Sequence, residues 1–452
     1  MTSLYEPLFR HVLFPAYESV LRGRKTLTYL RDYERQQWLD PEQIDALQWQ
    51  KLKHLIRHCW EHVPYYRETW QALGIAAADD IRDREHFARL PVLDKPTIRE
   101  NFERLIADTH REGLLFKTTS GSTGESLKFG YTRESYERRV AVMWRGYGWA
   151  GAKPGKRTFY LWGGSLASSL NLTMMKARMY DAAFNRRVEN SFLMNEVDLE
   201  RNLARLDSFR PEIIVGYTGM LMRMAEWLQR TGRRVHRASA ILTAAEPLHE
   251  FQRPIIEAAF GAPVFNSYGC REFMLIAAEC GCREGLHVNQ DHLLVQCGRA
   301  LSADPDDRSR EAVITDLHNY GMPLLRYLNG DVITPMPGAC SCGRGLERIA
   351  RIEGRTLDVI YSSDGKILHS GYVTYLFLQI GGIDRFQIVQ RARDRLDVYL
   401  VRGIDFSDGV LDYLRTELGK AVGDSIAMEF HFVDAIALTA SGKYRVMVSE
   451  ID

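Results

Sequence analysis

The sequence has 452 residues, of which 45% are hydrophobic, and its 59 Lys and Arg nearly balance its 58 Asp and Glu. A formal net charge of +1 excludes a global field that would favour nucleic acid or an anionic membrane. The length predicts more than one domain, since domains usually contain roughly 100–200 residues.

The N-terminal segment alternates apolar residues with His, Arg and Glu, so it lacks the apolar run of a signal peptide. No window approaches the ~20 apolar residues that a membrane span needs. Six of the seven cysteines fall between Cys270 and Cys342, and an odd total is unlike a secreted disulfide scaffold. We therefore expect a cytoplasmic protein.

Helices are expected first, from Pro7 to about Gln71, with a break at Pro64 and a new helix beginning near Pro96. Beyond residue 124 the pattern becomes α/β. Helices are predicted at Met220–Arg230 and Leu248–Phe260, between strands at Thr158–Trp162, Ile213–Val215, Ala240–Leu242 and Pro263–Asn266. Strands separated by helices predict a mostly parallel sheet flanked by helices on both faces.

From about Val313 the predicted strands are shorter and closer together, and the charged segment Ile352–Asp358 is the candidate linker. A helix is predicted at Asp405–Ala421, among strands at Phe386–Val389, Leu396–Val401 and Ala427–Phe432. We predict an α/β protein with a large N-terminal domain, residues 1–354, whose first 110 residues form a helical lead-in. A small α+β C-terminal domain, residues 355–452, would act as a lid.

The run Thr118–Gly124, TTSGSTG, carries two glycines among hydroxyl side chains. Glycine permits backbone conformations in which successive N–H groups converge on phosphate oxygens, and the hydroxyls add donors. Lys117 and Lys128 flank the run. A flexible Ser/Gly surface loop is the alternative. The run is not a Walker loop, because no Gly-Lys-Ser/Thr follows.

This run resembles the phosphate-binding motif of the adenylate-forming superfamily, which includes acyl-CoA synthetases and adenylation domains. The chain more narrowly resembles phenylacetate–CoA ligases and their relatives in capsular polysaccharide biosynthesis. The resemblance extends along nearly the whole chain, through motifs at His62–Tyr66, Leu90–Lys95, Thr243–Leu248, Ser267–Glu272, Leu325–Asp331, Glu353–Asp358 and Thr439–Lys443. Each motif is weak alone, but their order and spacing together are specific.

The resemblance implies a nucleotide site made of Thr119, Ser120, Gly121, Ser122, Thr123, Gly124, Ala245, Glu246, Tyr268, Gly269, Asp331 and Arg355. It places the Tyr268 ring against adenine, Asp331 at the ribose hydroxyls and Arg355 beside the nucleotide. An ordinary Asn-Gly-Asp turn is the alternative for Asp331. A helix N-terminal turn explains Glu246 equally well.

The catalytic residues implied by the resemblance are Lys443, Glu272 and Thr123. Glu272 would hold Mg²⁺, which prefers carboxylate oxygen and offsets phosphate charge as pyrophosphate leaves. Lys443 would stabilise charge on the bridging oxygens during adenylation. In such enzymes the lid rotates about a residue two positions after the linker arginine, usually Asp or Lys. Here that residue is Leu357, so the hinge is not assigned.

A zinc site is predicted from the cysteines, because thiolates with one imidazole suit tetrahedral Zn²⁺. The resemblance implies that the ligands are Cys280, His287, Cys340 and Cys342, with Cys282 competing for one place. Such a metal would join two loops and do no chemistry. Reduced loop cysteines are the alternative.

A pocket for the acid is expected between the sheet and the adenine loops, with walls at Tyr160, Trp162, Gly163, Tyr217 and Thr218. Aromatic walls favour an aryl or arylacetic acid. The alternative is that these aromatics are core residues. No feature of the sequence itself identifies CoA as the acceptor.

The resemblance implies an AMP-forming acid–thiol ligase, which uses ATP and Mg²⁺ to build an acyl-adenylate and transfers the acyl group to CoA. One alternative delivers the acyl group to an amine or a carrier protein in polysaccharide or natural-product biosynthesis. Another is a catalytically silent nucleotide-binding assembly component. A homodimer is also considered.

Overall fold

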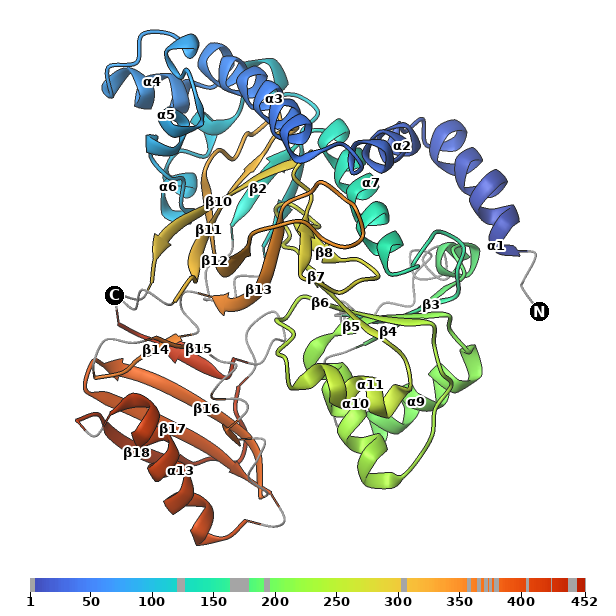
Figure 1. Cartoon of the computed structure of the whole chain (residues 1–452), viewed down its shortest axis with the longest axis vertical. Helices are drawn as coiled ribbons and strands as arrows, with labels where there is room; N and C mark the ends of the chain where they lie inside the picture. The colour runs from blue at the N-terminus through green and yellow to red at the C-terminus, as the bar shows by residue number, and fades with distance from the viewer. Residues whose placement is uncertain are drawn as a thin grey trace.

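The protein is described by a computed structural model over residues 5–119, 127–162, 179–190, 196–301, 307–355, 359–363, 367–369, 373, 376–377, 382–403, 406–423, 425–437 and 445–451. These residues form one large sheet, a smaller sheet near the C-terminus, and helices that cover both (Figure 1). Within the described residues, no helix is both long and apolar enough to cross a bilayer.

One half of the large sheet is parallel. Its strands are β3 (Thr158–Trp162), β4 (Arg186–Asn190), β5 (Ile213–Tyr217), β6 (Ala240–Ala244) and β7 (Val264–Tyr268), in the order β4-β3-β5-β6-β7. Every pairing among them is parallel. All residues of β5 and β6 are buried, as expected for strands covered on both faces. The predicted parallel α/β arrangement is confirmed here.

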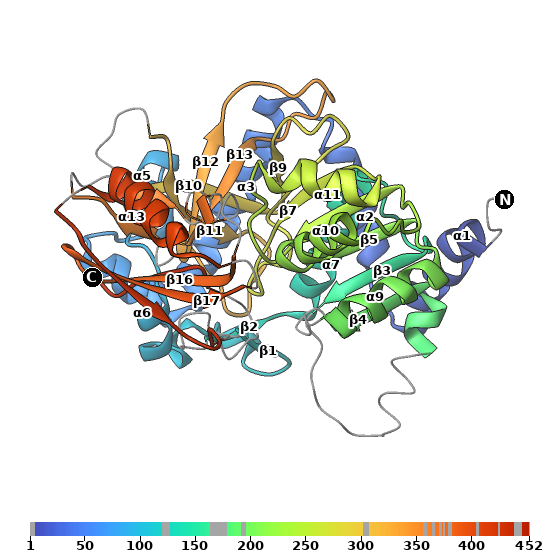
Figure 2. The same ribbon diagram turned by 90° about the horizontal axis from the view of Figure 1, so that it is seen from below.

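Helices pack on both faces of this parallel half. One face holds α9 (Glu196–Phe209), α10 (Thr218–Thr231) and α11 (Gln252–Phe260), which Figure 2 shows grouped together. The other face holds α2 (Thr26–Gln36) and α7 (Arg133–Trp149). Successive side chains of β5 point to opposite faces of the sheet. Ile214 therefore packs in the core with α9, α10 and α11, and Val215 packs in the core with α2 and α7. The helix predicted from Leu248 begins only at Gln252.

The other half of the large sheet is antiparallel. After β7 come β8 (Ala277–Glu279), β9 (Leu286–Val288), β13 (Arg348–Arg355), β12 (Tyr327–Met336), β11 (Arg310–Asp316) and β10 (Leu293–Ala300), in this spatial order. Each pairs antiparallel with its neighbour. The 11-stranded sheet is therefore mixed rather than mostly parallel. Short connections such as that between β8 and β9 permit antiparallel pairing without a crossover helix.

Two expectations for this half are wrong. The strands after Val313 are not shorter, since β12 alone spans ten residues. Ile352–Arg355 belongs to β13 and not to a linker, because its backbone pairs with β12. Glu353, one of the charged residues that suggested a linker, is neutralised within the strand, because its Oε1 accepts a hydrogen bond from Arg351 Nε.

The helical lead-in packs against the antiparallel half. Buried side chains such as Leu52, Trp70 and Phe87 join a core with Ile314 and Tyr327. The predicted break at Pro64 is confirmed, since α3 ends at His62 and α4 begins at Pro64, and Pro96 lies in the first turn of α6 as predicted. The helices and single turns of this region are α1 (Tyr5–Leu8), the π turns η1 (Phe9–Leu13) and η2 (Ala16–Leu21), α3 (Pro41–His62), α4 (Pro64–Ala72), α5 (Arg84–Arg89), α6 (Lys95–Glu100), and the 3-10 turns η3 (Ala78–Asp80), η4 (Glu103–Leu105) and η5 (Asp108–His110).

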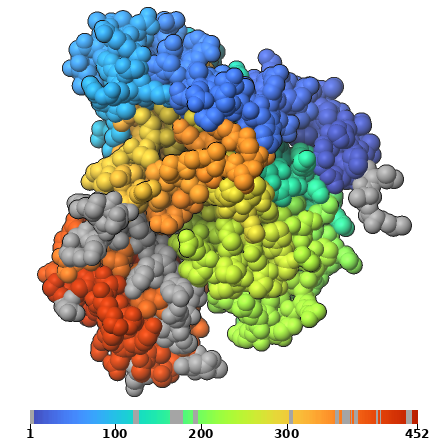
Figure 3. Space-filling view, viewed as in Figure 1, coloured from blue at the N-terminus to red at the C-terminus, as the bar shows by residue number. Residues whose placement is uncertain are grey.

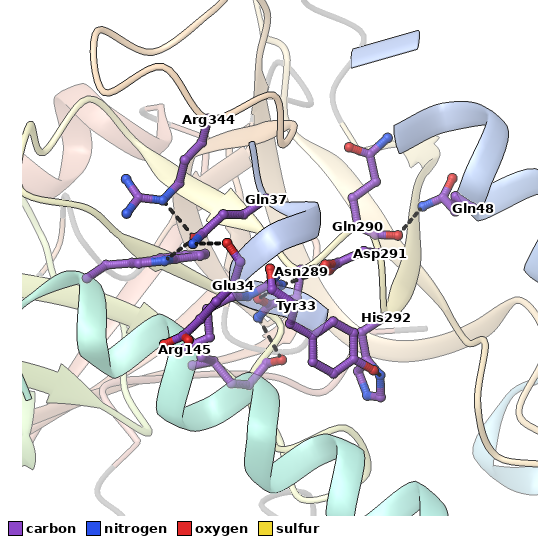
Figure 4. A network of polar contacts seen from close by, with 12 residues as sticks. Tyr33, Glu34, Gln37, Gln48, Arg145, Asn289, Gln290, Asp291, His292 and Arg344 are labelled. Atoms are coloured by element: carbon purple, nitrogen blue, oxygen red, sulfur yellow. Dashed lines mark hydrogen bonds and ion pairs between the residues drawn. The ribbon is translucent and has the colours of Figure 1, made fainter. Parts of the chain in front are cut away.

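A buried ion pair joins α2 and α7 to the loop after β9 (Figure 4). The Arg145 guanidinium donates to both oxygens of Asp291, at 2.5 and 2.7 Å, and also to Asn289 Oδ1 and the backbone oxygen of Tyr33. The Tyr33 hydroxyl lies 2.9 Å from His292 Nδ1. Because the side chains of Arg145 and Asp291 are 1% and 0% exposed, this pair holds the helices on the sheet from within the protein interior.

The C-terminal residues form a separate sheet of four strands in the order β18-β17-β16-β19, and Figure 3 shows them in a lobe of their own. Its strands are β16 (Ile383–Ala392), β17 (Arg395–Arg402), β18 (Ala427–Phe432) and β19 (Met447–Ser449), packed against α13 (Asp408–Val422), and the hairpin β14 (Val359–Tyr361) and β15 (Ile367–His369) precedes them. The α+β pattern and its own hydrophobic core agree with the predicted C-terminal domain, whose boundary stays a prediction.

Candidate active site

The base of the predicted phosphate loop is a short hairpin. β1 (Leu115–Thr118) pairs antiparallel with β2 (Lys128–Tyr131). Thr119 closes it, since its N–H donates to the Leu127 carbonyl at 2.8 Å and its hydroxyl accepts from the Leu127 N–H at 2.9 Å. Ser120, Gly121, Ser122, Thr123 and Gly124 lie outside the described residues, between these two anchored ends.

A tight turn follows β7 and approaches this hairpin. Gly269 permits the turn, because a Cβ at this position would lie 1.9 Å from the backbone oxygen of Met274. The Arg271 guanidinium donates to the Thr118 backbone oxygen at 2.6 Å. The structure thus brings the segment from Tyr268 to Glu272 next to the base of the phosphate loop, although about 150 residues separate them in the chain.

Three residues, Tyr268, Asn329 and Arg355, converge on the Asp331 carboxylate. Oδ2 accepts from the Tyr268 hydroxyl at 2.8 Å and from Asn329 Nδ2 at 2.6 Å, while Oδ1 lies 3.5 Å from Arg355 Nε. Asp331 and Arg355 are cross-strand partners on β12 and β13. Burial and the Asp331 charge raise the pKa of Tyr268 well above its usual range, so its hydroxyl remains a donor. The carboxylate is therefore held in one orientation.

Glu272 belongs to the same group of charged side chains as Asp331 and Arg355, and it is 5% exposed. Its Oε1 accepts from the Tyr327 hydroxyl at 2.9 Å, and a buried carboxylate of this kind suits a hard cation. Lys95, which the sequence did not identify as a site residue, lies near enough to Glu272 and Asp331 to interact with their charges. Burial and Arg355 lower the pKa of Lys95, while Glu272 and Asp331 oppose that shift. Its only sequence signal was its place in the motif Leu90–Lys95.

Ala245 and Glu246 follow the carboxyl end of β6. Ala245 has a φ of +67°, a left-handed conformation that is uncommon for a residue with a Cβ and is often found at functional sites. The Glu246 carboxylate accepts from the Gly219 N–H at 2.7 Å, at the first turn of α10. Its contact at a helix N-terminus agrees with the structural alternative for Glu246.

The predicted acid-pocket walls lie at the carboxyl ends of β3 and β5. The rings of Trp162 and Tyr217 meet edge to face with centroids 5.1 Å apart, and the Thr218 hydroxyl donates to the backbone oxygen of Glu246. Tyr160 lies two residues further inside and packs against the core under α2 and α7. Gly163 lies outside the described residues, as does the predicted catalytic Lys443.

Most of these groups therefore gather at one edge of the sheet. The carboxyl ends of β3, β5, β6 and β7 carry Trp162, Tyr217, Ala245 and Tyr268. Ligands of open α/β sheets bind in the crevice at the carboxyl ends of parallel strands. The Asp331 carboxylate is fixed by hydrogen bonds and lies near the Gly269 turn and the base of the predicted phosphate loop. This arrangement suits a ligand that contains a sugar and phosphates.

The four predicted zinc ligands also lie together. The ligand atoms of Cys280, His287, Cys340 and Cys342 are all within 4.8 Å of one another, and Cys282 is exposed outside the group. Burial lowers the pKa of His287 to about 4, so the ring is neutral at pH 7 and keeps a lone pair for a metal. The donor set fits tetrahedral Zn²⁺.

Comparisons with known proteins agree with this geometry. Residues 360–450 match the family model described as the CapK C-terminal domain. Over 92% of each chain, the fold matches a solved structure of 2-hydroxyisobutyryl-CoA ligase in complex with 2-HIB-AMP, with a TM-score of 0.71 and 20% identity. The protein therefore has the fold of the adenylate-forming ligases.

More particular relatives are found among curated sequences. The chain is 27% identical to phenylacetate-coenzyme A ligase of Thermus thermophilus, over 79% of this chain and 81% of that protein. It is 26% identical to protein CapK of Staphylococcus aureus, over 80% of each chain. These similarities confirm the resemblance to phenylacetate–CoA ligases, and they add CapK as a second named relative.

Proposed function

We propose that this protein is an AMP-forming acid–CoA ligase. A carboxylate attacks the α-phosphorus of ATP and releases pyrophosphate, and the thiol of CoA then attacks the acyl carbon and releases AMP. The observation that carries the proposal is the set of three buried side chains, Tyr268, Asn329 and Asp331, with the partly exposed Arg355, beside the phosphate-loop base. Relatives named phenylacetate-coenzyme A ligase support the same reaction.

Each residue of the set has a role in the proposal. Asp331 accepts hydrogen bonds from the ribose hydroxyls, and its three neighbours keep it oriented for them. Tyr268, Gly269 and Ala245 line the adenine side. Glu272 would hold Mg²⁺, which offsets phosphate charge as pyrophosphate leaves. Lys95 and Arg355 add positive charge beside the same phosphates.

The acid and the acceptor are assigned from separate observations. The edge-to-face pair Trp162 and Tyr217 at the strand ends supports an aryl or arylacetic acid as substrate. CoA as acceptor rests on the names of the relatives. The cytoplasmic location and the homodimer stay predictions.

The proposal is tested by acid-dependent ATP–pyrophosphate exchange with a panel of aryl, arylacetic and aliphatic acids. We expect exchange with at least one acid, followed by AMP release when CoA is added. Exchange without CoA-dependent turnover would favour an amine or a carrier protein as acceptor. No exchange with any acid would favour the silent assembly component.

Replacing Asp331 with alanine should lower kcat/KM for ATP in this assay by about 5- to 150-fold. This range corresponds to the ~1–3 kcal/mol that it costs to leave the ribose hydroxyls without their hydrogen-bond acceptor. The matched control is Asp79→Ala, an exposed carboxylate whose side chain is 85% exposed. Equal activity of the Asp331→Ala variant and the wild type would remove Asp331 from the nucleotide site.

We also propose that Cys280, His287, Cys340 and Cys342 bind one structural Zn²⁺. The ion would tie the turn after β8 to the loop between β12 and β13, and it takes no part in the reaction steps. The compact donor set supports this assignment, as does the neutral state of His287.

Protein purified without chelator is expected to contain about one zinc per chain by elemental analysis, since four protein ligands complete a structural site. The Cys340→Ser variant should lose that zinc and unfold several degrees lower, because metal binding contributes to folding. Cys297→Ser, which changes an exposed cysteine outside the cluster, should keep both zinc and thermal stability. Zinc-free wild-type protein would contradict the assignment.

A further inference from the structure

The first described helix carries apolar side chains on its outer face as well as on its inner face. The turns of α1, η1 and η2 follow one another without a break, so residues 5–21 form one rod at the edge of the molecule (Figures 1 and 2). Phe9 and Phe14 anchor the inner face, because both are buried with ring centroids 5.0 and 5.8 Å from that of Phe184. The outer face is therefore held in one orientation toward solvent.

The outer face of this rod is an apolar stripe. Its large apolar side chains, which are 41–83% exposed, are Leu8, Val12, Leu13, Val20 and Leu21. Together with the exposed Ala16 they recur every four or five residues, the spacing that places side chains on one face when helical hydrogen bonds span five residues. Five of the fifteen large apolar side chains exposed in the described residues lie on this rod, so they form a patch and are not scattered singly. Contiguous apolar patches of this kind mark interaction sites.

The charged side chains beside the stripe give it a basic rim. Two acidic side chains of the rod, Glu6 and Glu18, are each held in an ion pair with an arginine, and Glu18 is buried. Among the lysines, arginines and carboxylates of residues 5–25, those with exposed side chains are Arg22 and Lys25, which directly follow the stripe. The net charge of +1 describes the whole chain and not this surface. An anionic partner fits the rim, whereas a second copy of the chain would bring basic side chains against basic side chains.

We propose that residues 5–25 dock the protein on the surface of an anionic lipid bilayer. The rod stands out at the upper right edge of the molecule in Figure 3, so its stripe is a ridge and not a groove. An amphipathic helix of this kind lies in the plane of the interface, with its apolar face among the headgroups and its basic side chains beside the lipid phosphates. The C-terminal lobe lies at the opposite end of the molecule in Figures 1 and 2, so docking leaves that lobe away from the bilayer.

The test is cosedimentation of the full chain with vesicles of equal parts phosphatidylglycerol and phosphatidylcholine, and with vesicles of phosphatidylcholine alone. We expect binding to the anionic vesicles that weakens as the salt concentration rises, because counter-ions screen the basic rim. Val12→Gln/Val20→Gln removes apolar area from the stripe and should lower the partition coefficient by about 10-fold or more. Arg22→Gln/Lys25→Gln should lower binding to the anionic vesicles by about 10- to 30-fold, since each basic side chain near the surface contributes to it.

The matched control is Leu73→Gln/Val197→Gln, which changes two apolar side chains, 54% and 73% exposed, outside the rod and should leave vesicle binding unchanged. Circular dichroism and thermal unfolding establish that each variant is folded. The proposal is overturned if the wild type binds neither kind of vesicle, or binds both equally, or if Val12→Gln/Val20→Gln binds as tightly as the wild type. A wild-type dimer in sedimentation velocity that Val12→Gln/Val20→Gln converts to a monomer, without vesicle binding, would also overturn it and assign the stripe to a second copy.

Discussion

Replacing Lys443 with alanine is expected to lower acid-dependent ATP–pyrophosphate exchange by about 10²- to 10³-fold or more, while thioester formation from supplied acyl-adenylate and CoA survives. Charge builds on the bridging oxygens as the carboxylate attacks the α-phosphorus, and a positioned ammonium stabilises it only in that step. Lys443 lies outside the described residues, so the assignment rests on the resemblance of Leu438–Lys443 to the family motif.

The two half-reactions should be measured separately, by exchange and by AMP release from synthetic acyl-adenylate. Lys420→Ala is a suitable control, because Lys420 belongs to the same lobe and pairs with Glu417 on the exposed side of α13. It should leave both half-reactions unchanged. Equal loss of both half-reactions in the Lys443→Ala variant would refute the role of Lys443 in adenylation.

Replacing Asp291 with asparagine is expected to lower the free energy of unfolding by ~3–5 kcal/mol, because it leaves the Arg145 charge buried without its counter-ion. The change keeps the shape of the side chain, so the loss reports on charge rather than on packing. Asp291 accepts two of the four hydrogen bonds that the Arg145 guanidinium donates in the interior (Figure 4). Urea unfolding followed by tryptophan fluorescence measures the effect.

Two further variants separate the charge from other causes. Asp32→Asn breaks the exposed pair with Arg35 and should change stability by less than about 1 kcal/mol. The double variant Arg145→Met/Asp291→Leu removes both buried charges and should recover much of the loss, as replaced buried pairs often do. A double variant no more stable than Asp291→Asn would mean that the pair is not the cause.

Four strands of the parallel half, β3, β5, β6 and β7, could be predicted from the sequence because each is a short, largely apolar run. The fifth, β4, was not predicted, because its sequence RRVEN carries three charges and one valine. β3 and the starts of β5 and β6 lie where the sequence placed them. The antiparallel half could not. Its strands carry charges that pair along a strand, as Arg351 does with Glu353, or across the ladder, as Arg355 does with Asp331. The end of β13 therefore has the composition of a linker until β12 is placed beside it.

The candidate site shows the same limit. The motifs identified Tyr268 and Asp331, but the hydrogen bond between them joins residues 63 positions apart, which no local pattern encodes. Lys95 and Arg271 were missed as site residues, because a charged residue near a proline or a turn has the pattern of a solvated side chain. The four predicted zinc ligands do lie close together, and the zinc itself stays a prediction.

Arg355 ends β13 and is paired through that strand with the large sheet at Asp331. If the C-terminal lobe pivots at a point beyond residue 355, Arg355 and Asp331 stay together whichever way the lobe is turned. Lys443 would then leave the site after the first half-reaction, while Arg355 and Asp331 keep their contacts with the adenosine. We expect acyl-AMP to be retained until the thiol arrives, so that little of it escapes to hydrolysis in water.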